Sequence, residues 1–315
     1  MHIEIIIIIA GLIGLWYGSD LLLTSGKNIA RHFGISDFFF GLAFVSIGTS
    51  IPEIAVSIAG AIDRLNGIET SGIVLGDKIG SAIVNITLFM GIFGLFIILR
   101  LKKKELITQS MSLIGSTVFF FLLAFDGVLS RGDALLFLLA FGLYYAYLYK
   151  TEPVRTTERK PKLEVTKDII FAIAGVLFII VSSNAVVVHG VKLAEALGIN
   201  QTLIGIFLVG IGTGLPELSV MLASARHRMM SLSMGDLMGS NVVDLLLATG
   251  LGGVISSFIV DKRLLVFDIP ALFIFSAILI YYLRKDSKIT RVEGISLIIL
   301  YLVYVIMAIQ VNGNV

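Results

Sequence analysis

Two glutamates stand directly after a proline in the middle of otherwise apolar segments. Glu53 ends the sequence GTSIPE, and Glu217 ends the closely similar sequence GTGLPE. Proline removes a backbone donor and clashes with the preceding turn, so a helix is expected to break at each motif. The break would leave backbone carbonyls free at Thr49 and Thr213, beside the two carboxylates. Each copy therefore predicts a cluster of oxygen atoms around one glutamate.

Further hydroxyl and carboxylate groups occur at helical spacing near these glutamates. In the first copy, the polar residues that are three or four apart and share one helix face are Ser46, Thr49, Ser50, Glu53 and Ser57. A second polar line with the spacing i, i+4, i+8 comprises Asp77, Ser81 and Asn85 after the first motif, and Asp236, Ser240 and Asp244 after the second. The glycines beside these residues would permit a neighbouring helix to approach closely, and they are Gly76, Gly80, Gly235 and Gly239.

The donors are all oxygen atoms, which is typical of a site for a hard cation. Calcium accepts about six to eight oxygen ligands at roughly 2.3–2.6 Å, so two glutamates, carbonyls and water would satisfy it. Magnesium holds its water molecules more tightly and fits a carbonyl-rich site less well. The chain has no cysteine, and these segments have no histidine, which argues against zinc or copper. Calcium would therefore be the transported ion, and no resident cofactor is expected.

Other interpretations of these residues stay open from the residues alone. The serines and glycines could serve only helix packing, and the aspartates could be structural, for example Asp77 paired with a nearby lysine. Gly-Asp inside membrane helices is also found in intramembrane aspartyl proteases, but that interpretation leaves the repeated Pro-Glu unexplained. A channel would conduct ions without any counter-ion. The duplicated motif favours a transporter, and no catalytic residue is predicted.

The composition places these motifs in a membrane protein. The chain of 315 residues is 57% hydrophobic and 15% charged, whereas soluble chains average about 25% charged residues. Apolar runs of about 18 or more residues are typical of membrane-spanning helices. Ten spanning segments are predicted, at residues 3–25, 36–62, 70–99, 106–125, 132–149, 168–188, 199–225, 231–259, 264–283 and 292–311. The lipid bilayer is the expected surrounding, and no nucleic-acid partner is expected.

Lysine and arginine are distributed unevenly between the connections. Most of them follow the odd-numbered segments, and few follow the even-numbered ones. The positive-inside rule then places the first group in the cytoplasm and both termini outside the cell membrane. The segment 150–167 contains Pro153, Pro161 and a dense run of charges, so we predict a solvated cytoplasmic linker there.

The two sides of this linker repeat each other. GLAFVSIGTSIPE in the first half matches GIFLVGIGTGLPE in the second, GDKIGS matches GDLMGS, and Asn85 corresponds to Asp244. The halves, 1–149 and 168–315, contain five predicted segments each. Because five is odd, the second half must enter the membrane in the opposite orientation. The predicted fold is an all-α membrane protein with ten transmembrane helices in two inverted five-helix repeats, interrupted at the midplane.

These paired motifs resemble those of a known family. GTSIPE and GTGLPE, each followed by G-x-x-x-G-S-x-x-x-[ND], are similar to the two alpha repeats of the calcium/cation antiporter superfamily, which includes sodium/calcium and proton/calcium exchangers. The resemblance extends over essentially the whole chain. It implies that Glu53 and Glu217 hold calcium, helped by the carbonyls of Thr49 and Thr213, and that the first and sixth segments slide across the other eight. The residues that it implies for the surroundings and the coupling ions are Ser50, Ser81, Asn85, Ser240 and Asp244.

Two departures from the sodium-coupled pattern affect the expected counter-ion. Gly214 stands where that pattern has a serine, and Asp77 and Asp236 stand where it usually has asparagine. The missing hydroxyl removes a possible sodium ligand, and additional crowded carboxylates can bind protons. The sequence therefore favours exchange of calcium for protons by alternating access, with sodium/calcium exchange as the alternative.

Overall fold

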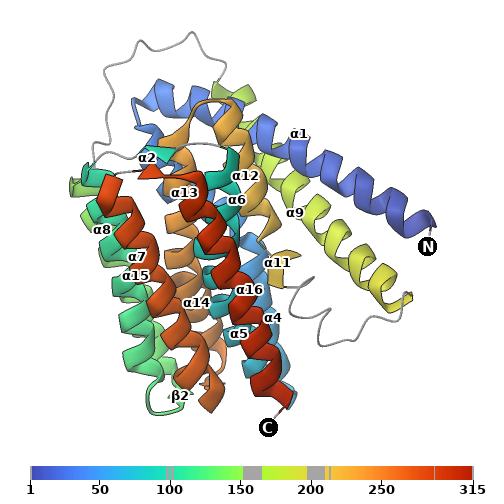
Figure 1. Cartoon of the computed structure of the whole chain (residues 1–315), viewed down its shortest axis with the longest axis vertical. Helices are drawn as coiled ribbons and strands as arrows, with labels where there is room; N and C mark the ends of the chain where they lie inside the picture. The colour runs from blue at the N-terminus through green and yellow to red at the C-terminus, as the bar shows by residue number, and fades with distance from the viewer. Residues whose placement is uncertain are drawn as a thin grey trace. The chain divides into compact units, whose positions relative to one another are not determined.

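The structure is a computed structural model that describes residues 2–96, 99–100, 103–151, 165–196, 210–212, 214–286 and 288–313. The helices before residue 152 are α1 (His2–Phe33), α2 (Asp37–Phe40), α3 (Ser46–Thr49), α4 (Ile51–Leu65), α5 (Ser71–Val84), α6 (Met90–Phe96), α7 (Lys103–Ala124) and α8 (Arg131–Thr151) (Figure 1). The later helices are α9 (Val165–Ala196), α11 (Gly210–Gly212), α12 (Leu215–Arg226), α13 (Met230–Val242), α14 (Thr249–Ile255), α15 (Ile269–Asp286) and α16 (Arg291–Gly313).

Short wide turns and short strands complete the described elements. The π-helical turns are η1 (Gly41–Val45), η2 (Asn85–Phe89), η4 (Val243–Ala248) and η5 (Leu264–Asp268). The strands are β1 (Leu99–Arg100), β2 (Val128–Leu129), β3 (Phe258–Ile259) and β4 (Lys288–Ile289). Each strand has two residues, and they pair antiparallel as β1 with β4 and β2 with β3. The strands therefore join connections between helices and do not form a sheet layer.

Each predicted segment overlaps helices where the chain is described, although α1 and α9 both extend beyond the predicted ends at residues 25 and 188. Residues 199–209 and Thr213 of the seventh segment lie outside the described residues, as does most of the predicted linker 150–167. Six helices of the described chain are long and apolar enough to cross a membrane, or seven if the interrupted helix of residues 37–65 counts as one span. The breaks expected in GTSIPE and GTGLPE are both present, since α3 ends at Thr49 and α12 begins at Leu215.

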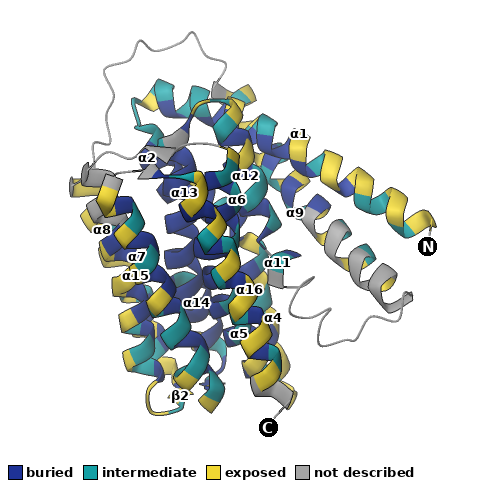
Figure 2. Cartoon of the chain, viewed as in Figure 1, coloured by how far each residue is buried: buried dark blue, intermediate teal, exposed yellow. Residues whose placement is uncertain are grey.

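The distribution of side chains is that of a protein surrounded by lipid. Large apolar side chains are exposed along α1 and α16. Figure 2 shows exposed residues along both of these helices. The buried residues include many polar ones, among them both glutamates of the proline motifs. In water the reverse arrangement is usual, whereas in a bilayer polar groups must find partners inside the protein.

The described chain divides into two compact units. Unit 1 contains Met1–Pro52 and Leu143–Ser240, and unit 2 contains Glu53–Gly142 and Asn241–Val315. Each unit therefore takes helices from both sequence halves.

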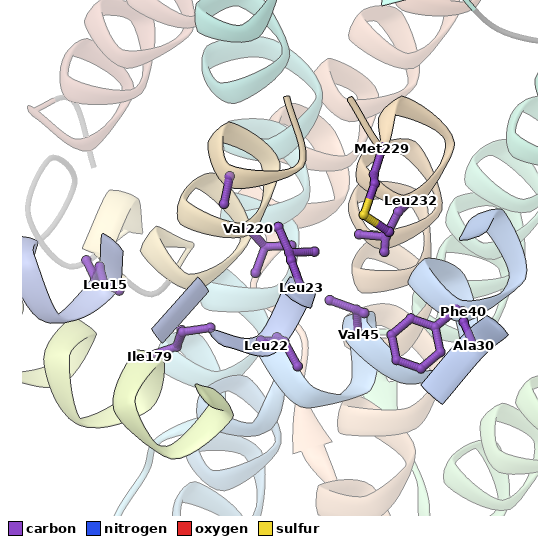
Figure 3. Packing of buried hydrophobic residues seen from close by; sticks show 11 residues of the cluster. Leu15, Leu22, Leu23, Ala30, Phe40, Val45, Ile179, Val220, Met229 and Leu232 are labelled. Atoms are coloured by element: carbon purple, nitrogen blue, oxygen red, sulfur yellow. The ribbon is translucent and has the colours of Figure 1, made fainter. Parts of the chain in front are cut away.

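In unit 1, α1 and α9 lie side by side along much of their length (Figure 1). A methyl group on Gly175 of α9 would lie 2.7 Å from the backbone nitrogen of Leu22 and 2.9 Å from the carbonyl oxygen of Gly18. Glycine at this position therefore allows the two backbones to approach closely. Apolar side chains of α1, α2, η1, α9, α12 and α13 form the core next to this contact, and Figure 3 shows Leu23, Val220 and Leu232 among them.

In unit 2, glycines again allow two helices to approach closely. A methyl group on Gly91 of α6 would lie 2.7 Å from the carbonyl oxygen of Gly294 in α16. Helix α15 packs against both α5 and α7. These contacts hold α5, which carries two of the predicted site residues, Asp77 and Ser81, within a helical framework.

Candidate ion-binding site

The two helix breaks have the same backbone conformation at matched positions. Ser50 has φ −83° and ψ 10°, and Gly214 has φ −86° and ψ 3°. Such angles are open to any residue, so the backbone does not require glycine at position 214. The repeat seen in the sequence is therefore reproduced in the local structure of both interruptions.

In unit 1, residues from both sequence halves meet at the end of α3. The hydroxyl of Thr49 lies 3.2 Å from Oδ1 of Asp236 and 3.4 Å from Oγ of Ser240. Ser50 makes a long contact of 3.5 Å from its hydroxyl to Oε1 of Glu217. We call these five residues the Thr49 cluster. Each of them is at most 1% exposed, so the cluster gathers two carboxylates and three hydroxyls away from solvent.

Glycine makes this meeting possible. A methyl group on Gly235 would collide with the carbonyl oxygen of Phe38 and lie 2.9 Å from the nitrogen of Leu42. One on Gly239 would lie 2.7 Å from the carbonyl oxygen of Leu42. The close approach predicted for these two glycines is confirmed, whereas no described residue lies within 4 Å of a methyl group added at Gly76 or Gly80. It brings α13 against α2 and η1, so that Thr49 can reach Asp236.

In unit 2, α5 and η2 face the second half in the same way. Ser81 donates to Oδ2 of Asp244 at 2.8 Å, and Nδ2 of Asn85 lies 3.5 Å from Oδ1 of Asn241. All four residues are at most 2% exposed. We call them the Ser81 cluster. Asn241 was not predicted, because in the sequence it is a single polar residue beside the Ser240 line.

Both polar lines of the repeat run into π-helical turns. Asn85 begins η2, and Asp244 lies in η4, at corresponding positions. A π turn is wider than an α turn, and single π turns are frequent at functional sites. The sequence carries no signal for it, since the residues around Asn85 are ordinary helix-compatible apolar residues.

Glu53 lies in the first turn of α4, and it is 1% exposed. Its backbone carbonyl accepts a hydrogen bond of 2.7 Å from the ammonium of Lys78, which also lies 2.7 Å from Oδ2 of Asp77. Asp77 is therefore paired with a nearby lysine, as the structural alternative for this residue predicted. Asp236, which corresponds to Asp77 in the second copy, instead accepts a hydrogen bond from the hydroxyl of Thr49.

The predicted site residues are thus placed in groups within the two units. Thr213 alone among them lies outside the described residues. Within the described chain, no three histidine, cysteine, aspartate or glutamate side chains form a group that would hold a metal ion. Hydroxyl oxygen atoms accompany the carboxylates in both clusters, and the Ser81 cluster adds the side-chain amides of Asn85 and Asn241, which is a mixture suited to a hard cation such as calcium.

Comparison with known proteins identifies the family. The family described as sodium/calcium exchanger protein matches residues 3–150 and 167–310. The chain belongs to this family. It is 30% identical to the sodium/calcium exchanger MaX1 of Methanosarcina acetivorans, over 96% of this chain and 98% of that protein. It is 28% identical to the putative antiporter CaxA of Alkalimonas amylolytica, over 96% of this chain and 98% of the relative.

A solved structure extends this similarity to the fold. The sodium-calcium exchanger NCX_Mj, in a crystal soaked with sodium and strontium, matches with a TM-score of 0.82 at 30% identity, covering 96% of this chain and 97% of that one. The likeness confirms the fold class predicted from the sequence, an all-α membrane protein of ten helices in two inverted repeats. The chain is a member of the calcium/cation antiporter superfamily and not an enzyme.

Proposed function

We propose that this sodium/calcium exchanger family member moves calcium across the membrane in exchange for sodium, by alternating access. Its similarity to MaX1 and to NCX_Mj, both named sodium/calcium exchangers, supports sodium as the counter-ion. The comparisons thus favour the sodium alternative over the proton coupling that Gly214, Asp77 and Asp236 suggested. CaxA, named only as a putative antiporter, does not distinguish the two.

Glu53 and Glu217 are the calcium ligands in this proposal. The observation that carries it is that the two glutamates occupy matched positions after matched helix breaks and are each 1% exposed. A carboxylate at such depth is stabilised by a cation. The carbonyls of Thr49 and Thr213 would complete the donor set at the interruptions. Two carboxylates offset the charge of one calcium ion.

The remaining oxygen atoms are proposed to serve the coupling ions. In the Thr49 cluster, Ser50 and Ser240 supply hydroxyls, and Asp236 supplies a carboxylate. In the Ser81 cluster, Asn85 and Asp244 supply an amide and a carboxylate around Ser81 itself, and Asp77 lies on the same helix as Ser81. Oxygen atoms shared by calcium and the coupling ions can serve only one of them at a time, because each ion needs the same lone pairs. Release of one ion would then be required before the other binds, which produces exchange.

Gradient-driven uptake into proteoliposomes tests the counter-ion. With the purified chain, an outward sodium gradient is expected to drive calcium uptake, because sodium leaving the vesicle provides the free energy. Equal sodium on both sides should give no net uptake. A pH gradient that drives uptake without sodium, while the sodium gradient does not, would contradict sodium coupling and support the proton alternative. Calcium flux in the absence of any counter-ion would indicate a channel.

We also propose that both termini lie outside the cell and that residues 150–167 lie in the cytoplasm, with 1–149 and 168–315 as the two repeats. The natural chain has no cysteine, so single cysteines can report on topology without a background. Asn66→Cys, in the connection between α4 and α5, is expected to react with a membrane-impermeant maleimide on intact cells. Thr156→Cys should react only after the membrane is permeabilised. The opposite labelling pattern would contradict the proposed orientation of the chain in the membrane.

A further inference from the structure

A lysine is fully buried beside one of the two proposed calcium ligands. Lys78 lies in α5, and its side chain is 0% exposed. Its ammonium donates to the carbonyl oxygen of Glu53 and to Oδ2 of Asp77, at 2.7 Å in both cases. An ammonium has three donors, and these contacts use two of them. A carboxylate and a backbone carbonyl are also the oxygen donors that a bound monovalent metal ion would use.

The second copy of the repeat has no equivalent cation. Lys78 corresponds to Leu237, whereas Asp77 corresponds to Asp236. Asp236 accepts from the hydroxyl of Thr49, and Asp77 is paired with a full positive charge. The asymmetry therefore concerns charge: one aspartate has a cation supplied by the chain, and the other has a neutral hydroxyl.

Burial of the Lys78 ammonium lowers the free energy of unfolding unless its contacts compensate, so a functional role is expected for it. An ammonium or carboxylate buried without a partner is strongly destabilising, and even a paired one contributes little net stability compared with apolar residues. Leu237 shows that an apolar side chain is compatible with the corresponding position of the other copy. The contact with the carbonyl of Glu53 links the charge of Lys78 to the proposed calcium ligand.

We propose that Lys78 is a specificity-determining residue for the exchange, acting as a tethered cation. Its ammonium occupies a position between Asp77 and the Glu53 carbonyl that would otherwise bind a monovalent coupling ion. Because the lysine cannot dissociate, each transport cycle requires one monovalent coupling ion fewer. This inference rests on the proposed exchange of calcium for sodium, and it adds which residue sets the number of sodium ions.

Removing each charge of the Lys78–Asp77 pair is expected to change a different measured quantity. In Lys78→Met, the Asp77 carboxylate loses its ammonium partner and should bind sodium instead. The number of sodium ions exchanged per calcium should therefore rise by about one. In Asp77→Asn, the uncompensated ammonium repels cations, and the calcium concentration for half-saturation should rise roughly tenfold. Combining both substitutions removes both charges and should return both values to those of the natural chain. Lys78→Arg should retain the natural sodium-to-calcium ratio.

The ratio is obtained in proteoliposomes from the membrane potential at which net calcium flux is zero, at fixed sodium and calcium gradients. Lys262→Met is the matched control, because Lys262 also follows an aspartate but is exposed in a connection. If Lys78→Met does not fold, Asp77→Asn and the double variant still decide the matter through the half-saturation value. An unchanged ratio in folded Lys78→Met, or an unchanged half-saturation concentration in Asp77→Asn, would overturn the proposal.

Calcium binding to the same purified proteins in detergent separates this inference from the proposed function. If the natural chain shows no sodium-driven uptake, the exchange proposal fails. A roughly tenfold loss of calcium binding in Asp77→Asn, restored in the double variant, would still support the charge role of Lys78. Normal uptake together with unchanged binding in Asp77→Asn would overturn the role of Lys78 alone.

Discussion

Replacing either Glu53 or Glu217 with glutamine is expected to abolish calcium transport while the protein still folds and inserts. Glutamine preserves the shape of the side chain and removes its charge. Two unit charges 4 Å apart attract by about 4 kcal/mol at an effective dielectric constant of 20, and calcium carries twice that charge. A loss of at least about 100-fold in calcium affinity follows, because each 1.4 kcal/mol is tenfold. Calcium uptake into proteoliposomes and calcium binding in detergent measure it.

Asp63→Asn provides the matched control for this result. Asp63 lies on the same helix as Glu53, in α4, but it is exposed near the end of that helix. Its replacement removes one carboxylate without changing the buried oxygen atoms, so transport should stay at the natural level. Uptake like that of the natural chain by either glutamine variant would refute the assignment of both glutamates as calcium ligands. Loss of folded protein, judged by its elution in detergent, would show instead that the carboxylate is structural.

The helices were predictable because apolar runs and interrupting prolines are local signals. The end of the first helix was not: the sequence predicted residue 25, whereas α1 continues to Phe33. Polar residues, among them Asn28, follow the apolar run that ends near residue 25. In the structure Asn28 donates to Oδ1 of Asp168 in α9 at 2.9 Å, so a helix partner satisfies the polar group within the helix. Hydrophobicity marks where lipid contact ends, and the helix itself can continue further.

The burial of the candidate site residues was predictable, but their contacts were not. Helical spacing showed that Ser81 and Asn85 share a face, and the structure shows both buried. Which residues of the other half they contact depends on how helices pack, and the spacing within one helix contains no such information. Thr49 illustrates this point. It was predicted through its backbone carbonyl, and the structure adds that its hydroxyl contacts Asp236.

Lys78 shows a second kind of limit. Its position inside an apolar segment is evident in the sequence, and a partner for Asp77 was considered. The length and flexibility of a lysine side chain leave several possible partners within reach, including the adjacent carboxylate. Only the packing of α4 against α5 selects the carbonyl of Glu53 as the second acceptor.

Gly235→Ala is expected to destabilise the protein and to reduce transport together. The added methyl group would collide with the carbonyl oxygen of Phe38, and a backbone atom cannot turn away as a side chain can. Overpacking of this kind costs about 1–3 kcal/mol, and more where the backbone must move. Moving α13 away from η1 would also separate Thr49 from Asp236. The temperature at which half of the protein is lost in detergent should fall, and so should calcium uptake.

A glycine in an open position provides the contrast for that variant. Gly142 of α8 is exposed, and among the described residues nothing lies within 4 Å of a methyl group added there. Gly142→Ala should leave transport unchanged and stability equal or slightly higher, since alanine is favoured over glycine within a helix by about 0.5–1 kcal/mol. If Gly235→Ala behaved like Gly142→Ala, the contact of α13 with α2 and η1 would not be needed for function. Stability lost with transport intact would show that the contact holds the fold but does not position Thr49 for ion binding.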